Sequence, residues 1–400
     1  MEYLHLQACI FLVKSQKLIK MTRSNLNGIL FLIVMLLLPA FAVGEINIKR
    51  LSLADSLINE AIKEKTIPGG VLAVVHKGQL VYIKAYGNKA VYPDVEPMTI
   101  ETVFDLASVT KPFTALSIMI LAERGELNLD DPVRRYLPYM PRNIKIIHLL
   151  THTSGIPDYS NVAALVKKYG KGNRKGLEEY IAQMAGKNKP GEVFEYSCLN
   201  YVALQFIVEK ISGKSLQDFT QENIFKPLRM DNTSFNPKGE TLKLCAPTEK
   251  QKDGSVLRGV VHDSLSQYLN NGISGNAGLF SNAHDLVILV KMLLNNGELN
   301  GTRILSALSC EVMRTVPKGY EKFGRSLGWD NYSTYSSDHG NFFDRERTYG
   351  HTGYTGPGIF IDPVNETAVI FLAHRVHPNN VGSMVPLRAK LANIIAGSIE

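Results

Sequence analysis

Three short segments carry side-chain types that could take part in acyl transfer. The first is Ser108-Val109-Thr110-Lys111 at the start of a predicted helix, which puts the serine and the lysine one turn apart on one face. A serine hydroxyl is a weak nucleophile and must lose its proton as it attacks. A neutral lysine amine one turn away can take that proton if burial lowers its pKa, and the helix N-terminus favours developing negative charge. Taken alone, the segment also fits a capping serine followed by a solvated lysine.

The second and third segments supply a tyrosine and a glycine-rich turn. Tyr196 comes just before a predicted helix, and a nearby lysine ammonium would favour its phenolate, so that it could act as base and acid. The segment from Gly350 to Tyr354 lies on a predicted strand whose small residues leave room for a ligand along the edge. The backbone N–H of Tyr354 could pair with that of Ser108 as an oxyanion hole. Alone, these segments also fit an ordinary half-buried tyrosine and an ordinary turn.

Strand patterns lie near both ends of the chain, and helical patterns fill the middle. Residues 71–87 indicate a hairpin that turns at Lys77-Gly78, and further strands are predicted within residues 347–375. Helical periodicity and end signals predict helices over 51–65, 107–125, 197–213, 282–295 and 384–399. We therefore predict an α+β fold. Both chain ends would build one antiparallel sheet flanked by helices, with an all-helical subdomain beside it.

Residues 1–42 have the pattern of an export leader. From Met21 onward, Arg23 gives a positive segment, an apolar run follows, and Ala40-Phe41-Ala42 supplies the small residues of a signal peptidase site. The apolar run over 29–43 is shorter than the roughly 17 residues that span a bilayer core. The sequence thus favours a cleaved signal peptide with translation starting at Met21, and an uncleaved anchor stays open. We expect residues 43–400 to form a single domain of two subdomains, periplasmic or secreted.

Composition and residue spacing exclude several classes of protein. The 400 residues are 45% hydrophobic and 20% charged, which is typical of a globular protein. The net charge is +7, and no lysine or arginine block indicates nucleic-acid binding. The four cysteines, at 9, 198, 245 and 310, form neither a disulfide framework nor a CxxC metal site. His148 and His152 lack the glutamate of a zinc-binding HExxH helix, so we expect no metal and no cofactor.

Taken together, the three segments resemble those of the penicillin-recognising serine hydrolases in order, spacing and context. That family includes class C β-lactamases, serine D,D-carboxypeptidases and related esterases and D-aminopeptidases. The resemblance covers about residues 50–398 and includes the segments FDLASVTKPFTALSIMILAERGELNLDDPV, HLLTHTSGIPDY, IFKPLRMDNTSF, NAGLFSNAHDL and GHTGYTGPGIFIDP. It implies a β-lactamase/transpeptidase-like fold. It also implies Ser108 as the nucleophile and Lys111 and Tyr196 as the proton-handling pair. The triplet His351, Thr352 and Gly353 would lie at the substrate's edge, where His351 would orient Tyr196 or the substrate carboxylate.

Two positions depart from the family pattern. Cys198 stands at the third position of the family's Y-x-N motif, where an amide helps to hold the substrate's acylamido group, and cysteine is a much poorer hydrogen-bonding partner. His351 replaces the lysine of K-T-G, in a form that some carboxypeptidases and esterases carry. A histidine with a pKa near 6.5 is a weaker, pH-dependent holder of a carboxylate. Both departures favour a carboxypeptidase, esterase or amidase over a β-lactamase.

The sequence therefore predicts an exported serine hydrolase that forms a covalent acyl-enzyme. Its expected substrates are small-molecule or peptide amides or esters, namely a β-lactam, a D-Ala-type peptide such as cell-wall peptide, or an ester. The role of acylation base stays open between Lys111 and Tyr196. Also open is a reaction with Cys198 as nucleophile and His351 as base. Two non-enzymatic alternatives remain: an idle module that binds cell-wall peptide without turnover, and a surface scaffold anchored through residues 29–43.

Overall fold

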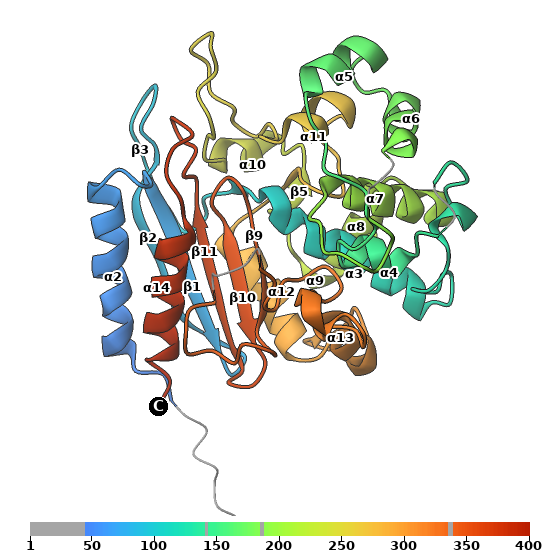
Figure 1. Ribbon diagram of the computed structural model, residues 1–400. Coiled ribbons are helices and arrows are strands. Elements are labelled where there is room, and N and C mark those ends of the chain that lie inside the picture. The colour runs from blue at the N-terminus through green and yellow to red at the C-terminus, as the bar shows by residue number, and fades with distance from the viewer. Residues whose placement is uncertain (1–44, 141–142, 185–187, 335–338) are drawn as a thin grey trace, which may run out of the picture. The chain divides into compact units, whose positions relative to one another are not determined.

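The computed structural model describes residues 45–140, 143–184, 188–334 and 339–400. Residues 46–398 form one compact unit, in which helices cover a central sheet (Figure 1). The predicted leader and its apolar run lie outside the described residues. Over the described ranges, no helix is both long enough and apolar enough to cross a membrane.

The central sheet takes its six strands from both ends of the chain. The strands are β1 (Gly69–His76), β2 (Gln79–Ala90), β3 (Glu96–Pro97), β9 (Tyr349–Thr352), β10 (Gly358–Asp362) and β11 (Thr367–Ala373). Their order is β3-β2-β1-β11-β10-β9, and all neighbours are antiparallel. The hairpin between β1 and β2 turns at Lys77 and Gly78, both with positive φ, as a turn that follows the strand twist requires. The predicted antiparallel sheet is confirmed.

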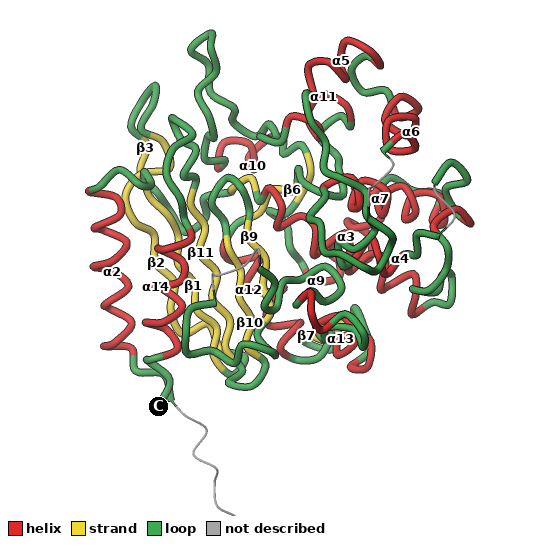
Figure 2. The backbone as a smooth tube through the Cα atoms, viewed as in Figure 1, coloured by secondary structure: helices red, strands yellow, loops and turns green. Residues whose placement is uncertain are grey.

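The two central strands, β1 and β11, are buried at every position. Helices α2 (Ile48–Lys63) and α14 (Val385–Ala396) lie side by side on one face of the sheet, and α12 (Ala283–Leu294) packs against β1 and β11 (Figures 1 and 2). A strand covered on both faces has no face exposed to solvent. Its sequence is therefore a continuous apolar run, without the alternation of apolar and polar residues that marks a half-exposed strand. The runs VLAVV in β1 and AVIFLA in β11 have this character.

The middle of the chain forms the helical region beside the sheet (Figure 2). Its central helices, α3 (Thr110–Glu123) and α7 (Cys198–Ser212), pack against each other, and every residue of α3 from Thr110 to Leu121 is buried. The surrounding helices are α4 (Ile146–Leu150), α5 (Val162–Tyr169), α6 (Arg174–Gln183), α8 (Leu216–Thr220), α9 (Lys226–Leu228) and α11 (Ser264–Leu269), with a π-helical turn η3 (Gln221–Phe225). A helix that is apolar all round belongs at the centre of such a bundle. The predicted helical subdomain is confirmed.

Short elements link the two regions. They are β4 (Phe104–Asp105), β5 (Ser234–Phe235), β6 (Leu279–Ser281), β7 (Glu298–Leu299), β8 (Thr302–Arg303), α10 (Gly239–Leu244), α13 (Ala307–Arg314), and the 3₁₀ turns η1 (Ala107–Val109), η2 (Val133–Arg135) and η4 (Glu321–Phe323). Strand β4 pairs with β6 and leads directly into η1 and α3. It therefore fixes the position of the turn that carries Ser108.

Candidate active site

Ser108 lies in η1, the tight turn between β4 and α3. The residue before it, Ala107, has a φ of +46°, in the left-handed region that non-glycine residues seldom adopt. The carboxylate of Asp105 supports this turn, because its two oxygens accept the backbone N–H groups of Ala107 at 2.9 Å and His262 at 2.7 Å. Burial raises the pKa of Asp105 to about 6, although both N–H donors oppose that rise. The serine is thus presented on a turn that buried hydrogen bonds hold in a strained conformation.

Lys111 lies fully buried beneath Ser108. Its Nζ donates to Ser108 Oγ at 2.9 Å and to the Asn276 carbonyl oxygen at 3.1 Å, and it lies 3.5 Å from Cys198 Sγ. Burial lowers the pKa of Lys111, whereas the ionised forms of Cys198 and Tyr196 raise it, and the pKa lies above its ordinary value overall. Lys111 is therefore an ammonium ion wherever Tyr196 is ionised, and it contacts the serine hydroxyl.

Tyr196 completes a group of three side chains with Ser108 and Lys111. Lys111 Nζ lies 4.9 Å from the centre of the Tyr196 ring, and the His152 ring stacks on it at 4.3 Å. Burial raises the pKa of Tyr196, whereas the charge of Lys111 and hydrogen bonds from Lys111 and Ser108 lower it in part. Tyr196 is consequently a phenol at neutral pH that can exchange a proton with its two neighbours.

A cleft of about 490 Å³ opens above these residues. Six of the eight residues predicted for the site line it: Ser108, Tyr196, Cys198, Thr352, Gly353 and Tyr354. Lys111 lies below its floor, in contact with Ser108. The structure thus brings seven of the eight into one place, from η1, α3, the start of α7 with the residues before it, and β9 with the turn that follows it.

Gly353 allows the β9–β10 turn to approach the nucleophile turn. A Cβ atom at this position would lie 2.4 Å from the Leu106 carbonyl oxygen, so any other residue would push the two turns apart. The hydroxyl of Thr355 holds them together by donating to the Asp105 carbonyl oxygen at 2.9 Å. This approach places the Tyr354 backbone beside the Ser108 turn. The pairing of the Tyr354 and Ser108 N–H groups as an oxyanion hole remains a prediction.

His351 is the predicted site residue that the structure does not bring to the cleft. Successive side chains of a strand point to opposite faces, so when Thr352 faces the cleft His351 faces away. The ring lines a separate small cavity with Arg325, Asp330 and His339, and its Nδ1–H donates to the Thr352 carbonyl oxygen at 2.9 Å. Burial, with the charges of Arg325 and Lys111, holds the pKa of His351 well below its usual range. The ring is neutral and buried away from the cleft, which does not favour our expectation that it orients the substrate carboxylate, and its expected role in orienting Tyr196 stays a prediction.

Cys198 is the first residue of α7 and forms part of the cleft wall. Its backbone N–H donates to Asp158 Oδ1 at 2.9 Å, which anchors the start of the helix. Burial raises the pKa of the Cys198 thiol to about 12, against the opposing charge of Lys111. A thiol in this state is a poor nucleophile. With His351 in another cavity, the cysteine–histidine alternative has no support in the geometry.

Comparison with known proteins shows the family of this chain. The family model described as Beta-lactamase matches residues 54–393. The chain belongs to the beta-lactamase family. It is 32% identical over 367 residues to a putative D-alanyl-D-alanine carboxypeptidase of Escherichia coli K12, and 32% identical over 372 residues to an N-acetylmuramyl-L-alanine amidase of Bacillus subtilis. The first match covers 83% of each chain, and the second covers 84% of this chain and 83% of the amidase.

Two solved structures have the same fold. The octameric penicillin-binding protein homologue of Pyrococcus abyssi superposes with a TM-score of 0.68 at 27% identity, over 86% of this chain and 77% of that one. EstCE1, described as a hydrolase with promiscuous acyltransferase activity, superposes with a TM-score of 0.70 at 24% identity, over 87% of this chain and 99% of that one. The predicted fold class and family are confirmed, and the chain is a serine hydrolase of this family.

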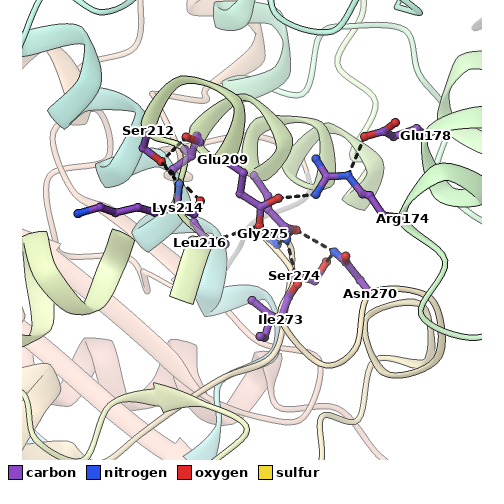
Figure 3. A network of polar contacts seen from close by, with 12 residues as sticks. Arg174, Glu178, Glu209, Ser212, Lys214, Leu216, Asn270, Ile273, Ser274 and Gly275 are labelled. Carbon is purple, nitrogen blue, oxygen red and sulfur yellow. Dashed lines mark hydrogen bonds and ion pairs between the residues drawn. The ribbon is translucent and has the colours of Figure 1, made fainter. Parts of the chain in front are cut away.

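Hydrogen bonds around the loop that contacts Lys111 hold that loop in place. The loop that carries the Asn276 carbonyl is tied to α7, because Gln205 Oε1 accepts the Gly275 N–H at 3.0 Å and the Asn270 side-chain amide at 2.8 Å. Figure 3 shows this network continuing through Glu209 to Arg174. A Cβ atom on Gly275 would lie 2.1 Å from the Tyr201 carbonyl oxygen, so this position requires glycine. The loop therefore cannot move away from Lys111 without breaking contacts along α7.

Sequence reasoning missed several residues that line the cleft. Asp158, Tyr159 and Asp263 form one wall, where the Tyr159 hydroxyl donates to Asp263. Arg375 lines another part, and its Nε donates to the Tyr354 carbonyl oxygen at 2.9 Å. Asp158 and Tyr159 fall within the family-like segment HTSGIPDY, which could have indicated them. No local pattern marks Arg375 or Asp263, because only the fold brings them to Ser108.

Proposed function

We propose that this protein hydrolyses an amide or an ester through a covalent acyl-enzyme on Ser108. The observation that carries the proposal is the direct contact of Ser108 Oγ with Lys111 Nζ at 2.9 Å, in a cleft that Tyr196 also lines. The contact aligns the hydroxyl with the Lys111–Tyr196 pair, which can accept its proton once the pair has itself lost one. The family membership supports the same chemistry.

The reaction would proceed in two halves. In the form of the site whose Lys111–Tyr196 pair has lost one proton, Ser108 Oγ attacks the substrate carbonyl and its proton passes to that pair, while the backbone N–H groups of Ser108 and Tyr354 stabilise the oxyanion. The same proton then goes to the leaving amine or alcohol as the scissile bond breaks, which leaves an ester on Ser108. In the second half, water attacks that ester and gives its proton to the pair. The serine recovers a proton as the acid departs.

For the substrate we propose a D-Ala-type peptide, a related amide or an ester. The named relatives support this choice, since one is a putative D-alanyl-D-alanine carboxypeptidase and another an N-acetylmuramyl-L-alanine amidase. Cys198 lies in the cleft wall, and a thiol is a weak hydrogen-bonding group. We therefore expect only weak binding of a substrate's acylamido side chain at this position. An efficient β-lactamase is therefore the less favoured form of the proposal.

The test is to incubate the purified protein, residues 43–400, with a fluorophosphonate probe and separately with a fluorescent penicillin. Intact mass and peptide mapping then locate any adduct. We expect phosphonylation of Ser108, and labelling by penicillin as well would favour the cell-wall peptidase form. If well-folded protein gives no adduct with either probe, the proposal is wrong and an idle binding module becomes the better description.

Replacing Cys198 with asparagine should shift the substrate preference toward amides. The new side-chain amide can hydrogen-bond an acylamido group, and one such bond corresponds to about a tenfold change in rate. We expect acylation by the fluorescent penicillin to rise about tenfold, with hydrolysis of p-nitrophenyl acetate changed less than about threefold. Cys198→Ser, which keeps the shape without the reach of an amide, is the matched control. Equal changes for both substrates would show that Cys198 does not determine this preference.

We also propose that the protein is exported, on the strength of the leader pattern over residues 21–42. Cells that express the full chain should contain a mature protein whose N-terminus follows Ala42. Mass spectrometry of that N-terminus is the measurement. Residues before Met21 in the mature chain would contradict a start at Met21, and detergent-dependent extraction with 29–43 retained would show an anchor instead of a cleaved signal.

A further inference from the structure

Arg325 lies buried behind the ring of Tyr196. It follows η4 in the chain, is only 2% exposed, and its guanidinium carbon lies 5.5 Å from the centre of the Tyr196 ring and 5.3 Å from that of Phe194. On its other side, Nη2 forms an ion pair with Asp330 Oδ2 at 2.9 Å. A guanidinium keeps its charge at any pH that a folded protein survives. The site thus has a permanent positive charge next to the tyrosine.

The two imidazoles near this charge are neutral. His152 stacks on Tyr196, and its Nδ1 accepts the Ser197 N–H at 3.1 Å, so that nitrogen carries no proton. Burial and the charge of Arg325, in that order, hold the pKa of both His152 and His351 well below the usual range. Neither histidine can supply the second positive charge at Tyr196, although His351 occupies the lysine position of the family's triplet. Arg325 can supply it.

We propose that Arg325 is a positioning residue for Tyr196, whose fixed positive charge draws the negative charge of the deprotonated site onto the tyrosine oxygen. The proposal rests on the acyl-enzyme function proposed above. In the active form, Lys111 is an ammonium and Tyr196 is a phenolate. The proton of Ser108 Oγ passes to the Tyr196 oxygen as Oγ bonds to the carbonyl carbon, and it leaves with the amine or alcohol when the scissile bond breaks. Tyr196 is then the acylation base, and Lys111 holds the serine.

The titratable and charged groups near Tyr196 come from several elements. The charge of Lys111 from α3 favours the phenolate, and the guanidinium of Arg325 from the loop after η4 lies 5.5 Å from the ring centre. Cys198 and Tyr201 from α7 and His152 from the loop after α4 are neutral in the resting site. Asp330 opposes Arg325 from the far side of the ion pair, where both side chains are nearly inaccessible, at 3% for Arg325 and 7% for Asp330. Substitution of the two ion-pair partners should therefore act on Tyr196 in opposite directions.

The experiment measures the rate of Ser108 phosphonylation by a fluorophosphonate probe between pH 5 and 10, with circular dichroism to confirm folding. The probe does not titrate in this range, so the midpoint of the rising limb reports the enzyme. For Arg325→Met we expect that midpoint to rise by about one to three pH units, the usual effect of losing a charge at this distance. For Arg325→Lys, which keeps the charge, we expect a shift below about half a unit. Asp330→Asn should move the midpoint downward.

Loss of Arg325 could also act through packing alone. In that case Arg325→Met and Arg325→Lys would lower the rate at every pH and leave the midpoint in place, which would overturn the proposal. The double variant Arg325→Met with Asp330→Asn buries no unpaired charge, so it provides the comparison if a single variant fails to fold, and its midpoint should still exceed that of the unmodified protein. If the unmodified protein is not labelled at Ser108, the acyl-enzyme function itself has failed. Labelling with unmoved midpoints rejects only the role of Arg325.

Discussion

Ser108→Ala is expected to lower kcat for any ester or amide substrate by about 10⁴-fold or more, because no acyl-enzyme can form without the hydroxyl. The loss should appear in kcat and not in substrate affinity, since the cleft walls stay unchanged. Stability should change little, because Ser108 is only half-buried and its side chain bonds to Lys111 and Tyr196 at the cleft. Steady-state kinetics with p-nitrophenyl acetate, together with thermal unfolding, checks both parts.

The matched control for this variant is Ser117→Ala. Ser117 lies on the same helix, and its hydroxyl donates to the Phe113 carbonyl oxygen, one turn back. It should retain activity within about threefold, as expected for a residue that touches neither the cleft nor the reacting groups. A Ser108→Ala protein that keeps full turnover while Ser117→Ala behaves as described would disprove the assignment of the nucleophile.

Much of the fold was predictable because its signals are local. A few neighbouring residues are enough to predict several elements. Examples are the apolar runs of β1 and β11, the Lys77-Gly78 turn and the glycine that ends α7. The joining of the two chain ends followed from the order of strands and helices. The positions of β4 and η1 were not predictable, since they depend on pairing with β6, which lies far along the chain.

The candidate site was predictable only in part, for the same reason. Ser108 and Lys111 are one helical turn apart, so their contact follows from their spacing. The side of the strand that His351 faces depends on which neighbour meets the cleft, and that is set by the close approach of Gly353 to Leu106. Arg325 has no local pattern at all. Its place beside Tyr196 results from the contact of the loop after η4 with the rings of Phe194 and Tyr196, which lie far away in the sequence.

Lys111→Met should separate activity from stability most clearly. Lys111 is fully buried, and the favourable contacts of its ammonium are opposed by the cost of removing a charge from water, which is several kcal/mol in real proteins. Methionine has a similar length and no charge. The variant leaves the Asn276 carbonyl without its 3.1 Å donor, a loss of about 1–3 kcal/mol, which the recovered desolvation energy should match or exceed. We therefore expect the free energy of unfolding to stay within about 1 kcal/mol of the original value or to rise.

Activity should follow the opposite course. Without the ammonium, the Ser108 hydroxyl loses its partner and the Tyr196 phenolate loses its nearest positive charge, so kcat should fall by about 10³-fold or more. Chemical denaturation and steady-state kinetics on one preparation give both quantities. Thr114→Val on the same helix is the control, because it removes the buried hydrogen bond to the Gly275 carbonyl oxygen. That change should cost about 1 kcal/mol of stability with activity kept within about tenfold. If the Lys111→Met protein unfolds readily, the lysine is needed for stability and the prediction is wrong. If the variant is stable and inactive, the buried charge of Lys111 is needed for catalysis and not for folding.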